Sequence, residues 1–452
     1  MTSKITFYGG AGSVTGANFM LDTGSARILV DCGTVAVESS PDDVNHEPFA
    51  YDVHSVQALV VTHAHADHIG RIPKLVRDGF RGAIYSTGAT HDIAEIMFED
   101  ALHIMEEESL RSGTPVLYES DDIDRTMALW KTHTYHEPFH IQDVTVEFAD
   151  AGHILGSALV RFSRGGRTII FTGDLGNTPE PLLRDTESPE GANYLVMESV
   201  YGDRLHEERG ARKESLRSAI EDARVRKGTL LIPSFSVERT QVLLYEIHGM
   251  IDDGSMAPIP IFVDSPLASR VTPVFTAYGD DLNEEAKAML AAGGDLFSFP
   301  GLSTTRNKNE SMAIHKEDNP KVIIAGAGMS AGGRIRAHEA HYLGDKNATV
   351  LFVGFQAPGT LGRRLQDGQS KVNIDGEYIR VHAQIASLTG YSGHADRDQL
   401  MQFVENAGES LETVFVTMGE TKASLFLAQR ITDFLGIKAQ VPKKGESQTI
   451  EF

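Results

Sequence analysis

The run His63-Ala64-His65-Ala66-Asp67-His68 carries most of the information about the fold of this chain. It follows the apolar stretch at residues 58–62, which is typical of a buried strand. A turn after a strand can aim several side chains at one point, and imidazole and carboxylate are ligands that suit zinc. The first two histidines of the run can therefore serve one metal ion, and its aspartate and last histidine a second. A histidine-rich surface turn is the alternative, and the rest of the chain must decide between the two.

The composition is that of a globular enzyme-sized chain without disulfides. It has 452 residues, 41% of them hydrophobic and 23% charged, which suggests two to three domains. The net charge of −22 argues against indiscriminate nucleic-acid binding, although a metal site and local arginines can still attract a polyanion. The single cysteine, Cys32, excludes a thiolate-rich zinc cluster, and we expect it to be buried. No leader-like segment and no apolar run of bilayer length is found, so we expect a cytoplasmic protein without membrane association.

The pattern along the chain predicts three parts. Residues 1–205 contain short strands and two helices, at 71–78 and 91–108. Residues 206–370 alternate strands and helices, which indicates a separate unit with a mostly parallel sheet. Residues 371–452 return to short strands and complete the first unit, while residues 276–316 fit no clear pattern.

A glycine-rich stretch at residues 9–16 superficially fits a dinucleotide-binding fingerprint. That fingerprint needs a helix after the glycines, so that the helix N-terminus can hold the pyrophosphate. Here the next segment has the pattern of a strand, and we expect a tight turn near the active site instead.

Four further candidate ligands stand at the ends of strand-like runs or in turns. Asp31, His153 and Asp174 follow apolar runs, and His394 lies in a turn before a predicted helix. Taken singly, a buried core histidine or a turn aspartate explains each of them. Together with the run at 63–68 they resemble, in their order along the chain, the signature of the metallo-β-lactamase fold.

The continuation of the chain resembles one branch of that fold, the β-CASP nucleases. Glu198, in Glu-Ser-Val-Tyr-Gly-Asp-Arg, is similar to their acidic motif A, and His394 stands in a segment similar to motif C. The segments at 233–241, 264–268, 326–334 and 359–365 resemble the inserted β-CASP domain. The resemblance covers essentially the whole chain and is closest to bacterial and archaeal ribonucleases related to the mRNA 3′-end cleavage endonuclease. It implies an α/β protein, a metallo-β-lactamase αββα sandwich with an inserted β-CASP α/β domain.

The resemblance also implies two zinc ions per chain, with manganese as an alternative ion. His63, His65 and His153 would hold the first ion, Asp67, His68 and His394 the second, and Asp174 would bridge them. Asp31 would orient a ligand histidine. Asp67, Asp174, Glu198 and His394 would be the catalytic residues. Such shells leave a position for solvent, as catalytic zinc requires.

One departure from the family concerns the leaving-group acid. Motif B of the family usually contains a histidine, and the matching place here holds Arg363-Arg364, with Arg364 aligned to the histidine. Arginine can clamp phosphate but does not release its proton. His338 is a candidate substitute, with a helix-surface histidine as the alternative. The residues expected to contact substrate are Arg270, Ser330, Arg334, His338, Arg363 and Arg364, and surface salt bridges are the alternative for the arginines.

The function implied by the resemblance is metal-assisted hydrolysis of single-stranded RNA in processing or decay, mainly endonucleolytic with exonuclease activity also open. A DNA-repair nuclease of the same family and a hydrolase of small esters or lactams are the alternatives. His394 favours RNA, because the DNA branch tends to have an apolar residue there. About 165 inserted residues favour a polymer over a small substrate. A non-catalytic scaffold is disfavoured because every ligand is present, and a homodimer is a family expectation only.

Overall fold

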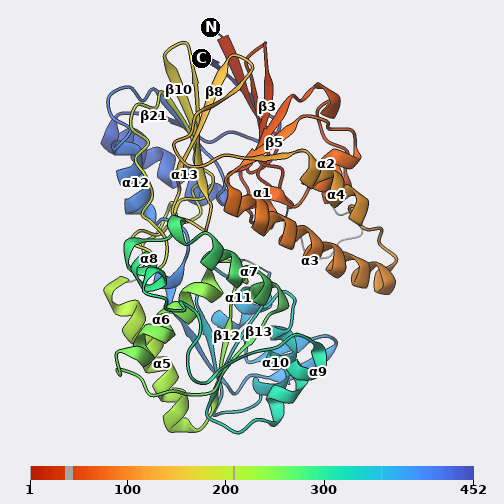
Figure 1. The fold of residues 1–452 in the computed structure, drawn as a ribbon, viewed down its shortest axis with the longest axis vertical. Coiled ribbons are helices and arrows are strands. Elements are labelled where there is room, and N and C mark those ends of the chain that lie inside the picture. The colour runs from red at the N-terminus through yellow and green to blue at the C-terminus, as the bar shows by residue number, and fades with distance from the viewer. Residues whose placement is uncertain (1, 36–43, 207–208, 358) are drawn as a thin grey trace. The chain divides into compact units, whose positions relative to one another are not determined.

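The computed structural model describes residues 2–35, 44–206, 209–357 and 359–452 (Figure 1). The chain forms two compact units, one of Met1–Leu205 with His394–Phe452 and one of His206–Gly393. The predicted border at residue 370 is therefore wrong, since residues 371–393 belong to the second unit. Strand β19 (Gln384–Ser387) pairs in parallel with β16 (Thr349–Phe352) of the second unit and so extends its sheet. The short strands in this stretch had suggested a return to the first unit.

The first unit contains two seven-stranded sheets. The first has the strand order β22-β1-β2-β3-β4-β5-β6 and the second the order β21-β20-β11-β10-β9-β8-β7. The strands of the first sheet are β1 (Thr2–Phe7), β2 (Phe19–Asp22), β3 (Arg27–Val30), β4 (Ala58–Val60), β5 (Ala83–Ser86), β6 (Trp130–Thr132) and β22 (Ser447–Glu451). Those of the second are β7 (Phe139–Ile141), β8 (Val144–Asp150), β9 (Ala158–Arg164), β10 (Arg167–Phe171), β11 (Tyr194–Met197), β20 (Thr413–Val416) and β21 (Lys438–Gln440).

The alternation of side chains along the strands explains why these sheets pack as layers. In β8, Phe148 joins a core that also contains Val30 and Val60 of the first sheet, so this core lies between the two sheets. The next residue, Ala149, joins a second core with Leu400 of helix α12 (Arg397–Glu405). The second sheet therefore buries both faces, one against the first sheet and one against helices. This confirms the αββα sandwich.

The helices of this unit begin and end at recognisable signals. The long helix α3 (Gly88–Ser112) is capped by Thr87 and ends at Gly113, which has a positive φ of 76°. Figure 1 shows α3 beside the first sheet, whereas α12 and α13 (Thr421–Arg430) lie along the second. The shorter helices are α1 (Ala66–Ile69), α2 (Ile72–Arg77) and α4 (Ser120–Ala128). No helix in the described ranges is both long and apolar enough to cross a membrane.

The glycine-rich stretch at residues 9–16 is a turn between β1 and β2, and a strand follows it rather than a helix. The strand that the sequence predicts after these glycines is thereby confirmed. Two backbone hydrogen bonds, from Tyr8 N–H and Gly9 N–H to the carbonyl of Asn18, close the turn.

The second unit is built on a parallel sheet of order β14-β13-β15-β12-β16-β19, as the alternating pattern predicted. Its other strands are β12 (Thr229–Pro233), β13 (Ile261–Asp264), β14 (Leu302–Thr304) and β15 (Lys321–Ala325), and a hairpin is formed by β17 (Lys371–Ile374) and β18 (Glu377–Arg380). The helices are α5 (Arg212–Arg226), α6 (Arg239–Asp252), α7 (Pro266–Ala277), α8 (Glu284–Ala291), α9 (Lys308–Ala313), α10 (Ile335–Tyr342) and α11 (Leu361–Gln366). The region at 276–316 that lacked a pattern contains α8, β14 and α9, all of them short.

Candidate metal centre

The candidate ligands stand just beyond the carboxyl ends of strands in the first unit. Asp31 directly follows β3, and the run at 63–68 begins shortly after the neighbouring parallel strand β4. His153 follows β8, and Asp174 and Glu198 follow the parallel neighbours β10 and β11. Strand pairing thus brings residues from distant parts of the chain to one edge of the two sheets.

The turn that carries Asp67 and His68 is fixed through its backbone. The Asp67 carbonyl accepts the Ala17 N–H at 2.9 Å, and the His68 carbonyl accepts the Cys32 N–H at 2.7 Å. Gly33 is required for this approach, because a Cβ at this position would lie 1.6 Å from the Asp67 carbonyl oxygen. The turn is therefore positioned independently of any ion.

The first cluster has the dimensions of a tetrahedral metal site. His65 Nδ1 lies 3.1 Å from His63 Nε2 and 3.2 Å from His153 Nε2. Asp174 Oδ2 lies 3.5 Å from the Nε2 atoms of His63 and of His153. Four ligands at zinc bond lengths of about 2.0–2.1 Å in a tetrahedron stand roughly 3.3 Å apart. These four side chains therefore fit one zinc ion without rearrangement.

The second cluster shares Asp174 with the first. His68 Nε2 lies 3.3 Å from Asp174 Oδ1 and 3.9 Å from Asp67 Oδ2. His68 Nε2 and Asp174 Oδ1 are buried without a hydrogen-bond partner among the described residues. Two such atoms facing each other would be costly unless a cation lay between them. His394 Nδ1 lies 3.9 Å from Asp174 Oδ2, so it borders the same space.

Two further buried carboxylates, Asp31 and Glu198, contact imidazoles of the clusters. Asp31 Oδ2 accepts a hydrogen bond from His68 Nδ1 at 2.8 Å, and both of its oxygens also bind Thr62. Glu198 is fully buried, accepts the Leu175 N–H at 2.7 Å and lies 3.2 Å from His394 Nδ1. Asp31 is thus placed to fix the orientation of the His68 imidazole. Glu198 faces the same His394 nitrogen as Asp174 does, and Asp174, Glu198 and His394 form a second group that could hold a metal ion.

The pKa of a histidine is lowered in the first cluster and raised in the second. Burial and the neighbouring imidazole of His68 hold the pKa of His63 well below its usual range, so His63 is neutral, the form that binds metal. Burial also disfavours the charged form of His394, but Glu198, Asp174 and Asp67 together outweigh it and raise the pKa of His394 to about 9. The histidine-rich side therefore excludes protons, and the carboxylate-rich side attracts positive charge.

Replacement of Asp31 by asparagine is expected to weaken zinc binding by roughly 10–100-fold, because His68 loses the carboxylate that orients it. Competition with a chromophoric chelator measures this affinity. Asp22→Asn is the control, since Asp22 pairs with Arg27 at the surface of the same sheet. Equal zinc affinity of wild type and Asp31→Asn would contradict the orienting role.

In the second unit, two of the predicted substrate-binding residues, His338 and Arg334, both contact Asp264. His338 Nε2 lies 2.7 Å from Asp264 Oδ2, and Arg334 Nη1 lies 2.5 Å from Asp264 Oδ1. His338 is fully buried, and its other ring nitrogen lies 3.0 Å from His315 Nε2. Both ring nitrogens are therefore engaged, and His338 does not fit the role of a substitute acid or a substrate contact. A histidine on the exposed helix surface, the alternative considered, does not describe it either.

Ser330 is also turned inward. It is fully buried with a positive φ of 54°, and its hydroxyl donates to Glu339 Oε1 at 2.5 Å. The arginines differ: Arg270 and Arg364 are exposed, and Arg363 pairs with Asp367 at 3.0 Å. Of the residues predicted to contact substrate, Arg270, Arg363 and Arg364 therefore remain accessible candidates for phosphate contacts in this unit.

Glu339 predicts a pH dependence of stability. Burial, only partly offset by Ser330 and the charge of Arg336, raises the pKa of Glu339 to about 8 from 4.5. Between these values the unfolded chain loses the proton and the folded protein keeps it, so the contribution of Glu339 falls as pH rises. Glu339→Gln should thus gain stability over wild type at pH 8.5, by up to roughly 4–5 kcal/mol, and little at pH 4.5. Urea unfolding at the two pH values checks this, and an equal difference at both would contradict it.

Some residues of the site were not found from the sequence. Thr62 and Gly33 act through backbone geometry, and Asp264 acts through partners from α9 and α10. The available signal for Asp264 was its place at the end of an apolar run, which the resemblance used only to identify the domain.

The chain matches family models in three stretches. Residues 240–365 match the model described as Beta-Casp domain, and residues 378–442 match the Zn-dependent metallo-hydrolase RNA specificity domain. Residues 4–195 match the model described as anti-Pycsar protein Apyc1. The matched stretches together include parts of both units.

Relatives match over nearly the full length of this chain. The chain is 35% identical over 444 residues to the Thermus thermophilus protein named Ribonuclease TTHA0252, covering 98% of this chain and 99% of that protein. It is 28% identical to the Methanosarcina mazei protein named Transcription termination factor FttA, covering 97% of this chain and 70% of that protein. A crystal structure of a protein of unknown function from Enterococcus faecalis has a similar fold, with a TM-score of 0.59, 13% identity and coverage of 100% of both chains. The full-length match at 35% identity and the Beta-Casp domain within it show that the chain belongs to the β-CASP family of metallo-β-lactamase-fold ribonucleases.

Proposed function

We propose that this protein is a zinc-dependent ribonuclease that hydrolyses phosphodiester bonds within single-stranded RNA. The observation that carries the proposal is the pair of clusters joined by Asp174, because a shared carboxylate is how two ions are held close together. The relative named a ribonuclease supports the choice of RNA, and the match to a zinc-dependent domain supports the choice of metal.

The proposed ligand set has two zinc ions per chain, with manganese as an alternative ion. His63, His65 and His153 would hold the first, Asp67, His68 and His394 the second, and Asp174 both. Bound there, the ions would supply a water nucleophile at neutral pH and neutralise phosphate charge. Glu198 would act by orienting His394, which fits its fully buried position. Arg363 and Arg364 would contact phosphates, and His338 is no longer proposed as the acid.

The proposal also includes the mode of cleavage, the cellular location and the oligomeric state. Endonucleolytic cleavage is the main mode, with trimming from an end as a second mode. Because the substrate is cellular RNA, we place the enzyme in the cytoplasm. A homodimer stays a prediction from the family.

Cleavage assays with labelled nucleic acid test the proposal. Internally labelled and end-labelled single-stranded RNA and DNA are incubated with the wild type, with zinc and with a chelator. Internal cuts in RNA that the chelator and His65→Ala abolish are expected, and cutting of a circular RNA would establish endonuclease action. Preferential cleavage of DNA would support the DNA-repair alternative. Turnover of esters or lactams without any RNA cleavage would overturn the nuclease assignment.

A further inference from the structure

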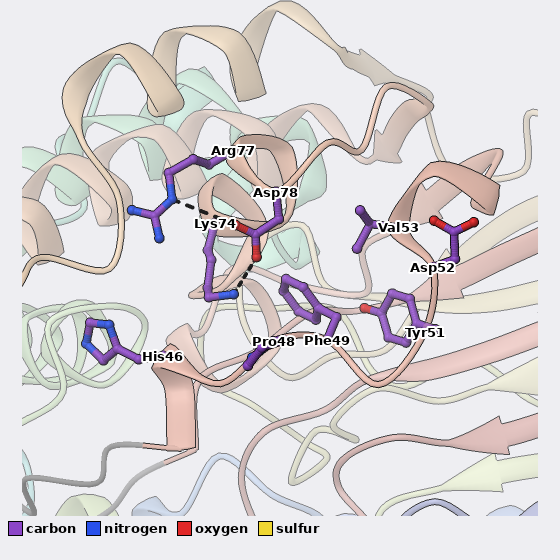
Figure 2. Close-up of a pocket in the computed structure, with 9 residues that line it drawn as sticks. All are labelled: His46, Pro48, Phe49, Tyr51, Asp52, Val53, Lys74, Arg77 and Asp78. Atoms are coloured by element: carbon purple, nitrogen blue, oxygen red, sulfur yellow. Dashed lines mark hydrogen bonds and ion pairs between the residues drawn. The ribbon is translucent and has the colours of Figure 1, made fainter.

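A cavity of about 480 Å³ opens in the first unit beside helix α2, outside the metal clusters (Figure 2). One wall is the segment at residues 46–53, between the 3₁₀ turns Val44–His46 and Val53–Ser55, and it presents Phe49 and Tyr51. The other wall is α2 with the residue that follows it, and it presents Lys74, Arg77 and Asp78. The volume lies within the range of about 300–1,000 Å³ that small-ligand pockets span.

The aromatic wall is a continuous row. The ring centroids of Phe49 and Tyr51 lie 5.4 Å apart, and those of Tyr51 and Tyr8 lie 4.7 Å apart. Two cations contact this row, with Lys74 Nζ 4.5 Å and Arg71 Cζ 4.4 Å from the Phe49 ring centroid. Both aromatic rings of the cavity wall are only partly buried. A partly exposed aromatic surface with cations beside it is a composition that single-stranded RNA contacts use.

Three cationic residues lie close together at helix α2, although the chain as a whole is negatively charged. Arg71, Lys74 and Arg77 recur every three residues and so share one face of the helix, in a protein with a net charge of −22. Asp78 compensates part of this charge, with Lys74 Nζ at 2.5 Å and Arg77 Nε at 3.8 Å from its carboxylate (Figure 2). The Lys74 side chain is only 4% exposed, whereas that of Arg77 is 39% exposed. Lys74 is thus used to hold the wall together, whereas Arg77, despite its long contact with Asp78, is exposed enough to meet a ligand from solvent.

We propose that this cavity binds one nucleotide of the RNA strand away from the scissile bond. The base would lie against the wall of Phe49 and Tyr51, and Arg77 would contact the phosphate. An anion alone would not need the aromatic wall, and an apolar ligand would not need the arginine. The proposal rests on the proposed RNA activity and adds a second place where the strand is held.

The position of the cavity suits such a role. Helix α2 begins four residues after His68, and the Arg71 N–H donates to the carbonyl of Cys32, which also anchors His68 through its own N–H. Lys74 and Arg77 thus follow His68 by six and nine residues, on the next helix of the same unit.

Steady-state cleavage of a 20-nucleotide RNA tests the cavity with two variants. Phe49→Leu keeps the apolar packing under Lys74 but removes the aromatic ring, and it should raise KM roughly tenfold with kcat little changed. Arg77→Ala removes one phosphate contact, so it should raise KM and flatten the slope of log KM against log salt by about 0.7. The matched control is Phe434→Leu, because Phe434 is an exposed ring with Arg430 at 4.6 Å in the same unit. We expect its KM to equal that of the wild type.

The possible outcomes distinguish a failure of the cavity proposal from a failure of the proposed ribonuclease activity. Wild-type cleavage of RNA with unchanged KM and salt slope in both variants would overturn the cavity proposal and leave the ribonuclease assignment intact. Absence of RNA cleavage by the zinc-loaded wild type would overturn both. A general loss of structure would lower kcat as well and appear in the melting temperature. Arg77→Ala, at a half-exposed position, therefore decides the question if Phe49→Leu is unstable.

Discussion

Asp174→Ala is expected to reduce RNA cleavage by about 10³-fold or more, the factor that a loss of roughly 4 kcal/mol of transition-state stabilisation produces. The Asp174 carboxylate faces both clusters, with one oxygen 3.5 Å from His63 Nε2 and the other 3.3 Å from His68 Nε2. Its removal would deprive both proposed ions of a ligand. Cleavage rates at saturating RNA, with zinc content measured on the same samples, check this.

The control for this variant is Asp124→Ala. Asp124 is an exposed aspartate on α4 of the same unit. Its replacement should leave both zinc content and cleavage at the wild-type level. Full activity of Asp174→Ala would show that the joined clusters are not where the reaction takes place.

Asp264→Ala is expected to destabilise the second unit by about 3–5 kcal/mol, the usual cost of removing one partner of a buried ion pair. Asp264 is fully buried, and it accepts hydrogen bonds from His338, Arg334, Thr305 and Ser311. Burial alone would raise the pKa of this carboxyl, but these partners reverse the effect and hold it well below its usual range. Its loss would leave several buried polar groups unpaired at once. Urea unfolding followed by hydrogen exchange in β13 and α10 measures the effect.

Asp375→Asn provides the comparison, because Asp375 pairs with Arg336 at 2.8 Å and is 74% exposed. Asparagine also tolerates the positive φ of 51° at this position. A surface ion pair of this kind contributes less than about 1 kcal/mol. The two variants should therefore differ severalfold in their effect on unfolding. Equal effects would mean that the buried network is not what stabilises this unit.

Most of the metal centre could be predicted from the sequence because strand ends are local signals. The run at 63–68 is contiguous, and Asp31, His153 and Asp174 each follow an apolar run that reveals its strand. Parallel pairing then requires neighbouring strand ends to meet at one edge, so the order of the sheet converts sequence order into proximity. The parallel sheet of the second unit was predictable from its alternating strands and helices, whereas the sandwich was implied by the family resemblance.

The parts that could not be predicted depend on long-range packing. The burial of His338 results from Asp264 and His315, which lie in other segments, and nothing in the local pattern of α10 distinguishes it from a surface histidine. The border after residue 370 was misplaced because pairing of β19 with β16, rather than strand length, decides which unit residues 371–393 join. Helix α8 was missed because it is short and carries little hydrophobic pattern.

The most direct test of the account is anomalous diffraction at the zinc edge from crystals of the zinc-loaded protein. We expect a strong peak among His63, His65, His153 and Asp174, and a second peak beside His68 on the other side of the Asp174 carboxylate. Zinc-loaded crystals with no anomalous peak within bonding distance of Asp174 would contradict the central claim that these distant segments converge to hold catalytic metal.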